Sequence, residues 1–165
     1  LVLMEEEGDW TGMFWRFQGA SDPDVDVLIV RDCDSRLWFR EKAAVDEWLA
    51  SDKGFHIMRD HPQHGTAILG GMWGCKKGIL PTMGSLMNYY TKGNFWQVDQ
   101  NFLREIVYPK IKEKAFVHDT FFEKKPFSMH RDPEHFVGQA YDGEDKILDS
   151  DSYFIDRRKP YESLR

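Results

Sequence analysis

The sequence predicts an α/β fold in which helices flank a sheet, and three observations support this. Residues 27–30 form a short, unbroken apolar run of mostly β-branched residues, which is typical of a strand buried on both faces, as in a parallel sheet. Residues 39–51 have the composition of a helix, with Trp48 and Leu49 on its apolar face. The short apolar runs 55–58 and 115–117 indicate two further strands.

Composition places bounds on the protein. The 165 residues are 41% hydrophobic, enough for a single domain over 1–165 with a polar C-terminal tail over 142–165. A net charge of -6 without a long basic run argues against binding to nucleic acid. Two isolated cysteines, Cys33 and Cys75, indicate a reducing, cytoplasmic compartment, and no apolar stretch approaches the roughly 20 residues of a transmembrane segment.

The strand predicted over 27–30 ends in Asp32 and Asp34. Carboxylates two residues apart leave an extended chain on the same side and repel each other unless a cation lies between them. Mg²⁺ and Mn²⁺ prefer oxygen ligands and often bridge to phosphates, and the flanking Arg31 and Arg36 favour phosphate binding. We therefore expect a metal and diphosphate site here; the alternative is a polar turn.

Glycines interrupt the next apolar run, at Gly70 and Gly71, followed by Met72 and Trp73. Glycine inside such a run marks a bulge or a close approach of a ligand or another backbone. We favour a backbone surface that a sugar can approach, with Trp73 offering an aromatic face. The alternative is a tight packing bulge.

Three other polar side chains are candidates for the site. Asp99 opens the helix predicted over 99–112, where it either caps the helix or serves as a base or acceptor ligand at a pocket floor. His118 follows the strand predicted over 115–117 and either completes the metal shell or forms a hydrogen bond in a loop. Lys124 either neutralises phosphate or is simply solvated.

Taken in order, these segments resemble a group of GT-A-type glycosyltransferases from bacteria and large algal viruses. The resemblance runs through residues 25–36, 41–48, 55–62 and 68–74, and continues through 99–103, 118–119 and 136–138. It implies a GT-A-like, Rossmann-like mixed sheet flanked by helices. Because only a short segment precedes Asp32, the resemblance also implies a partial catalytic domain that is truncated at its N-terminus.

The resemblance implies roles for individual residues. Asp32 and Asp34 would hold Mn²⁺ or Mg²⁺ on the diphosphate of a UDP- or GDP-sugar, with His118 as the third ligand. Gly70, Gly71 and Met72 would lie beside the donor sugar. Asp60 would also lie near the donor, and Asp99 with Gln100 would line the acceptor side.

The expected reaction is transfer of a sugar to a hydroxyl of a glycan or another acceptor, in glycan or polysaccharide synthesis. Asp99 is the predicted general base of an inverting enzyme, with Asp60 as the second choice, whereas a retaining enzyme needs no such base. Arg31, Arg36 and Lys124 would add positive charge at the leaving group. The alternatives are a metal-dependent phosphohydrolase or nucleotidyltransferase, and a non-catalytic carbohydrate-binding module.

Overall fold

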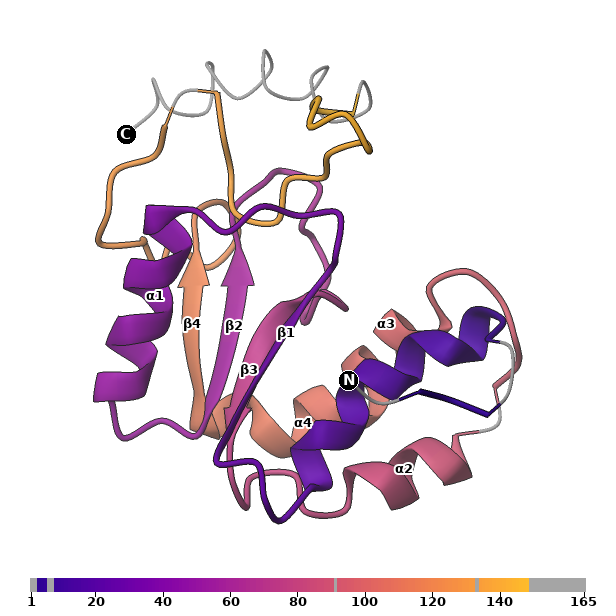
Figure 1. Cartoon of the computed structure of the whole chain (residues 1–165). Helices are drawn as coiled ribbons and strands as arrows, with labels where there is room; N and C mark the ends of the chain where they lie inside the picture. Colours follow the sequence, from indigo (N-terminus) through magenta and orange to yellow (C-terminus); the bar gives the residue numbers. More distant parts are fainter. Residues whose placement is uncertain (1–2, 6–7, 91, 133, 149–165) are drawn as a thin grey trace.

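A mixed four-stranded sheet organises the computed structural model, which describes residues 3–5, 8–90, 92–132 and 134–148 (Figure 1). The strands are β1 (Val27–Arg31), β2 (Phe55–Arg59), β3 (Met72–Lys76) and β4 (Ala115–Asp119). Their order is β1-β3-β2-β4, with β3 antiparallel to both neighbours and β4 parallel to β2. β1, β2 and β4 therefore run in one direction, and their carboxyl ends share one edge of the sheet.

Helices cover both faces of this sheet, as the α/β prediction requires. The predicted helix over 39–51 is confirmed as α1 (Phe39–Ala50), which covers one face (Figure 1). The other face carries η1 (Trp10–Ser21), a 3₁₀ helix, together with α2 (Met83–Tyr89), α3 (Val98–Phe102) and α4 (Tyr108–Ile111). The sheet is thus the middle layer between α1 and a group of helices from both halves of the chain.

The helix predicted over 99–112 is confirmed, but it is not uniform. Between α3 and α4 the backbone widens to a π-helical turn, η2 (Leu103–Val107), and after α4 it tightens to η3 (Lys112–Lys114). Pro109 explains the wide turn, because proline has no N–H and its ring would clash with the carbonyl four residues earlier. A π turn removes that clash and keeps the helical direction.

β1 is an edge strand, so the expectation of a strand buried on both faces is wrong. It pairs only with β3, in antiparallel orientation, among the described strands. Val27 is 41% and Ile29 43% exposed, whereas Val30 is 3% exposed. The apolar run forms a strand as predicted, but its place in the sheet depends on partners elsewhere in the chain.

β3 lies inside the sheet although its glycines weighed against a strand in the sequence. Gly74 explains this, because a Cβ there would lie 3.0 Å from both the Trp48 ring of α1 and the Leu28 carbonyl oxygen. The glycine thus lets the large Trp48 ring, which is fully buried, reach the sheet. The glycine serves packing between layers, the alternative that the sequence left open.

Two apolar clusters hold the layers together. The larger one lies between the sheet and η1, α2 and α3, with Phe17, Phe55, Trp73 and Phe102 at its centre. Phe55 and Trp73 stack with ring centroids 5.2 Å apart. The smaller cluster lies under α1 and includes Met58 and Met72. The residues next to these two in their strands, Ile57 and Trp73, belong to the larger cluster, because side chains alternate between the two faces of a sheet.

The segment after β4 crosses the carboxyl edge of the sheet (Figure 1). The strand-like run 136–141 forms no strand in the described part of the chain, but Ala140 forms a bridge with Ser35 and Tyr141 with Ile147. Of the predicted polar tail over 142–165, residues 142–148 form a turn, and the rest lies outside the described residues.

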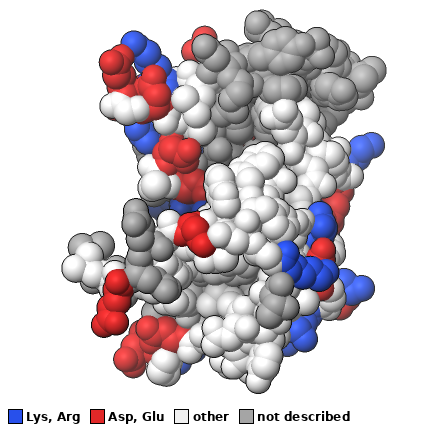
Figure 2. Space-filling view, turned by 90° about the vertical axis from the view of Figure 1, so that its right-hand side faces the viewer, with Lys and Arg blue, Asp and Glu red and all other residues white. Residues whose placement is uncertain are grey.

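The described surface carries both signs of charge. On the face in Figure 2, acidic side chains lie mainly toward the left and centre, and basic ones gather at the right. Within the described ranges, no helix has the length and apolar character needed to cross a bilayer.

Candidate functional site

The carboxyl edge of the sheet gathers most of the predicted site residues. Asp32 directly follows β1 and Asp60 directly follows β2, while Gly70 and Gly71 directly precede β3. Since β3 runs opposite to its neighbours, its beginning lies at the same edge as their ends. In open α/β sheets this is the edge at which ligands bind.

Arg16, which the sequence analysis did not single out, joins Asp32 to Asp99. From η1, one guanidinium nitrogen binds the Asp32 carboxylate and the other binds Oδ2 of Asp99 at 2.5 Å. Asp99 is fully buried, whereas the Asp32 side chain is 47% exposed. A planar guanidinium with several donors can bridge two carboxylates in this way, and it offsets their mutual repulsion.

Gly70 and Gly71 fit closely beneath this bridge. A Cβ on Gly70 would overlap the Arg16 guanidinium and lie 2.7 Å from Oδ2 of Asp99, and a Cβ on Gly71 would overlap the Asp32 carboxylate. The groups that approach these glycines are charged side chains of the same chain, which fits the packing alternative, and the approach of a sugar stays a prediction. Glycine is the only residue that leaves room for them.

Asp99 lies in the first turn of α3, not at its N-cap. The N-cap is Gln97, in a left-handed conformation with φ 69°. Among the described residues, Oδ1 of Asp99 has no hydrogen-bond partner although it is buried. A buried carboxylate oxygen left without a donor is costly, so this atom is suited to accept a hydrogen bond from a ligand hydroxyl. Gln100 follows on α3 and is partly buried.

Asp60 is enclosed by donors, which argues against a role as general base. Arg40 contacts both of its oxygens at 3.0 Å, the Thr120 hydroxyl donates at 2.6 Å and the Val137 N–H at 3.1 Å. Burial alone would raise the pKa of Asp60, but the Arg131 and Arg40 guanidinium groups outweigh it and lower that pKa. Asp60 is an ionised anchor that holds three segments together.

His118 is not placed to share a metal ion with Asp32 and Asp34. It lies on β4, three interstrand spacings or about 14 Å from β1. Its ring nitrogens contact His56 at 2.9 Å and Glu47 at 3.0 Å on the α1 face, whereas Asp32 turns to Arg16 on the opposite face. Burial lowers the pKa of His118, which fits the alternative of a hydrogen-bonded, neutral histidine.

A divalent metal at Asp32 and Asp34 would rely on few protein ligands. Among the described residues, no group of three or more His, Cys, Asp or Glu side chains is arranged to hold an ion. Asp34 is exposed, as is much of Asp32, so both can meet an ion from solvent. Because Mg²⁺ usually keeps waters and substrate phosphates beside one or two carboxylates, this pair fits such an ion.

Two of the three cations predicted to bind phosphate, Arg31 and Arg36, are paired with acidic side chains of the chain itself. Arg31 binds the buried Glu41 of α1. Arg36 binds Asp145 and lies over the Tyr141 ring, 5.3 Å from its centroid. Lys124 is exposed on the turn after β4, with φ 52°.

Trp73 does not offer an aromatic face to a ligand, so that expectation is wrong. Its side chain is fully buried against Phe55, and Met72 is 4% exposed in the cluster under α1. Both residues belong to β3, where the sheet and the helices cover them. Gly70 and Gly71, which lie beside the carboxylates, are buried as well.

Comparison with known proteins bears on the fold. No protein-family model matches the chain, and no curated protein matches its sequence. Among solved structures, the chain is similar to "a glycosyltransferase involved in the glycosylation of the major capsid of PBCV-1". The match has 19% sequence identity and a TM-score of 0.55, and covers 75% of this chain and 68% of that chain.

This chain has a glycosyltransferase-like fold. The α/β class predicted from the sequence, with a mixed sheet flanked by helices, is therefore confirmed. In this glycosyltransferase-like fold, Asp32, Asp99, Gly70, Gly71 and Arg16 form one cluster at the carboxyl edge. The cluster combines a solvent-facing carboxylate, a buried carboxylate with one oxygen that lacks a partner in the described part of the chain, and a fixed cation. Such a set can bind a polar ligand and accept a proton from it.

Proposed function

We propose that this chain is a glycosyltransferase that moves a sugar from a UDP- or GDP-sugar to an acceptor hydroxyl in glycan or polysaccharide synthesis. The observation that carries the proposal is the buried Asp99 carboxylate, which lies against Gly70 with Oδ2 held by Arg16 and Oδ1 unpaired among the described residues. The glycosyltransferase-like fold supports the same reaction class. A buried carboxylate oxygen that has no partner among the described residues is suited to take the proton of an attacking hydroxyl group.

The proposed donor site lies at Asp32, Asp34 and the two glycines. Mn²⁺ or Mg²⁺ held by the two carboxylates would supply charge neutralisation at the departing diphosphate. In this proposal the donor sugar lies beside Gly70 and Gly71, the two glycines that pack against Arg16 and Asp32. Asp34 is joined to the segment that crosses the edge, since its carbonyl accepts the Tyr141 N–H at 2.9 Å.

The proposed proton acceptor is Asp99. In an inverting transfer, the acceptor oxygen forms a bond to the anomeric carbon while the bond from that carbon to the diphosphate breaks, and Oδ1 of Asp99 takes the hydroxyl proton. Arg16 holds the carboxylate through Oδ2, so the base is fixed before the acceptor arrives. Gln100 lies next to Asp99 on α3, on the acceptor side. A retaining transfer would need no base at this position.

Calorimetric titration tests the donor site. UDP and GDP are titrated into the chain with and without Mn²⁺, and we expect binding that depends on the metal. Asp34→Ala should abolish that binding and leave the fold intact, as judged by circular dichroism. Asp52→Ala is the matched control, because Asp52 is an exposed aspartate in the turn before β2.

Two results would count against the proposal. Metal-dependent binding that survives Asp34→Ala would place the diphosphate elsewhere. Release of UDP or GDP from the donor at the same rate without an added sugar acceptor would indicate hydrolysis, and then a phosphohydrolase is the better reading of the carboxylates.

A further inference from the structure

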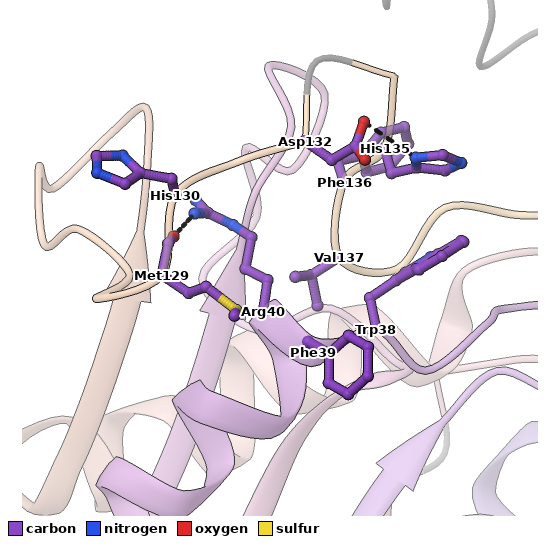
Figure 3. A pocket seen from close by; sticks show the side chains of 9 residues that line it. All are labelled: Trp38, Phe39, Arg40, Met129, His130, Asp132, His135, Phe136 and Val137. Atoms are coloured by element: carbon purple, nitrogen blue, oxygen red, sulfur yellow. Dashed lines mark hydrogen bonds and ion pairs between the residues drawn. The ribbon is translucent and has the colours of Figure 1, made fainter.

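A cavity opens beside the N-terminus of α1. It has a volume of about 410 Å³ and lies between the first residues of α1 and residues 129–132 and 135–137 (Figure 3). Trp38, Phe39 and Met129 supply apolar side chains around it, with Val137 between them. Asp132 and His135 line it from the crossing segment. Its size lies within the range of small-molecule pockets.

Buried polar contacts fix the walls of this cavity. Arg40 of α1 is held by both oxygens of Asp60 at 3.0 Å, and it also donates to the Met129 carbonyl. The Val137 N–H donates to the same Asp60 at 3.1 Å. Asp60, at the end of β2, therefore ties both walls to the sheet. A pocket whose walls are fixed loses little entropy when it binds a ligand.

Arg40, a cation that lines the cavity, is paired, which favours a neutral ligand over an anionic one. Asp60 compensates Arg40, and Nδ1 of His135 lies 3.1 Å from Asp132. Phosphate recognition commonly uses unpaired arginine side chains in a bidentate geometry, and Arg40 is already used in this way. The remaining polar groups can bind hydroxyls, while the apolar groups suit a ring with C–H faces.

Exposed apolar side chains at the cavity also favour a neutral ligand with C–H faces. Phe39 is 79% and Met129 44% exposed, although both lie beside a formed cavity. The Trp38 ring lies against the His135 ring in a tilted arrangement, their centroids 4.3 Å apart. Aromatic side chains combined with a few polar groups are typical of sites that bind amphipathic rings, and a pyranose is such a ring.

The cavity lies near the carboxylates at the edge of the sheet. Trp38 follows Asp34 by four residues, so their Cα atoms are at most about 14 Å apart. The bridge between Ser35 and Ala140 joins the two segments that connect the sites. Both sites lie along the carboxyl edge of the sheet, so a glycan of several units that follows this edge would meet both.

We infer that this cavity binds a neutral pyranose unit of the acceptor glycan, which rests on the proposed function. The reacting hydroxyl belongs to a unit near Asp99, and the cavity holds another unit of the same chain. The cavity thus selects acceptors with more than one sugar unit. Trp38 and Phe39 provide the contact surface, and Asp132 and His135 bind hydroxyls.

Saturation-transfer NMR on the full chain tests this inference. The probes are the methyl pyranosides of glucose, galactose, mannose and xylose, with uridine as a separate probe. We expect at least one pyranoside to bind, and Phe39→Ala to weaken it roughly three- to tenfold, the range for losing one aromatic contact. Trp38→Ala should weaken it likewise. Tyr89→Ala, which removes an aromatic side chain that is 85% exposed on α2, should not.

The outcomes separate this inference from the proposed function. Pyranoside binding that persists in Asp34→Ala and is lost in Phe39→Ala supports the cavity, whether or not donor binding is found. Donor binding without binding of any of the four pyranosides overturns the cavity and leaves the proposed function standing. Pyranoside binding that is equal in Phe39→Ala, Trp38→Ala and the native chain, or binding of uridine alone, also overturns it.

Discussion

Oδ2 of the buried Asp99 accepts a hydrogen bond of 2.5 Å from Arg16, which lies 83 positions earlier in the chain. The second guanidinium nitrogen of Arg16 binds Asp32. One side chain of η1 thus connects the end of β1 to the start of α3. This connection sets the relative position of the carboxylates on which the proposed chemistry depends.

Removing the guanidinium should destabilise the protein. Arg16→Gln leaves the charge of Asp99 buried without its cation. We expect the free energy of unfolding to fall by about 2–4 kcal/mol, which is less than for a completely buried pair because the Arg16 side chain is 24% exposed. Urea unfolding measures this. Arg104→Gln is the control, because Arg104 is 52% exposed and pairs with the adjacent Glu105. Equal losses in both variants would contradict the bridge.

Adding one methyl group at Gly71 should impair the donor site. Gly71→Ala places a Cβ against the Asp32 carboxylate, and an overpacking cost of roughly 1–3 kcal/mol corresponds to about 5- to 150-fold weaker metal-dependent binding of UDP or GDP. Calorimetry measures the change. Gly143→Ala provides the control, since a Cβ there meets nothing within 4 Å. Unchanged affinity in Gly71→Ala would show that Asp32 does not contact the donor.

Asp99→Asn should separate catalysis from binding. The amide keeps the shape of the carboxylate but cannot take a proton, so kcat should fall by about 10²- to 10⁴-fold, the usual range for a general base. The dissociation constant of UDP should stay within about twofold, because Asp99 lies outside the proposed diphosphate contacts. Loss of a contact worth about 1.4 kcal/mol would instead weaken UDP binding tenfold. A full kcat in this variant would favour a retaining transfer.

Acid should destabilise the chain through His56. Burial, with smaller contributions from the neighbouring His118 and Arg31, lowers the pKa of His56 from 6.5 to about 2. The folded state therefore binds fewer protons than the unfolded state, and the stability that is present above pH 6.5 is lost as the pH falls toward 2. At pH 5 this one group removes about 2 kcal/mol.

Urea unfolding at pH 7.5 and pH 5 measures this loss. His56→Gln removes the titrating group, so its stability should fall less between the two pH values than that of the native chain. His130→Gln, which changes an exposed histidine, should keep the native pH dependence. The same pH dependence in His56→Gln would assign the acid sensitivity to other groups.

Local patterns were sufficient for the elements of the fold. The strands at 55–59 and 115–119 and the helix at 39–50 all follow from short apolar runs and helical spacing. The position of β1 did not follow, because an apolar run specifies a strand but not its neighbours. β3 was missed because its glycines match the Trp48 ring of α1, a fit between segments 26 residues apart.

The candidate site was predictable only in part. Asp32, Asp99, Gly70 and Gly71 were found because charges at strand ends and glycines in apolar runs are unusual. Arg16 was missed, since nothing beside it in the sequence distinguishes it from a solvated arginine. Whether His118 faces Asp32 depends on strand order and on side-chain alternation across the sheet, which become known only with the register.

The position of β1 also affects how the chain behaves at high concentration. Its outer backbone N–H and C=O groups face away from β3, and the exposed Val27 and Ile29 lie along the same edge. An edge of this kind is a template for adding a strand from another molecule, which leads to aggregation unless a charge or a cover prevents it. A lysine introduced at position 29 would act as a gatekeeper against such pairing. Light scattering of Ile29→Lys beside the native chain would show how far this edge limits solubility.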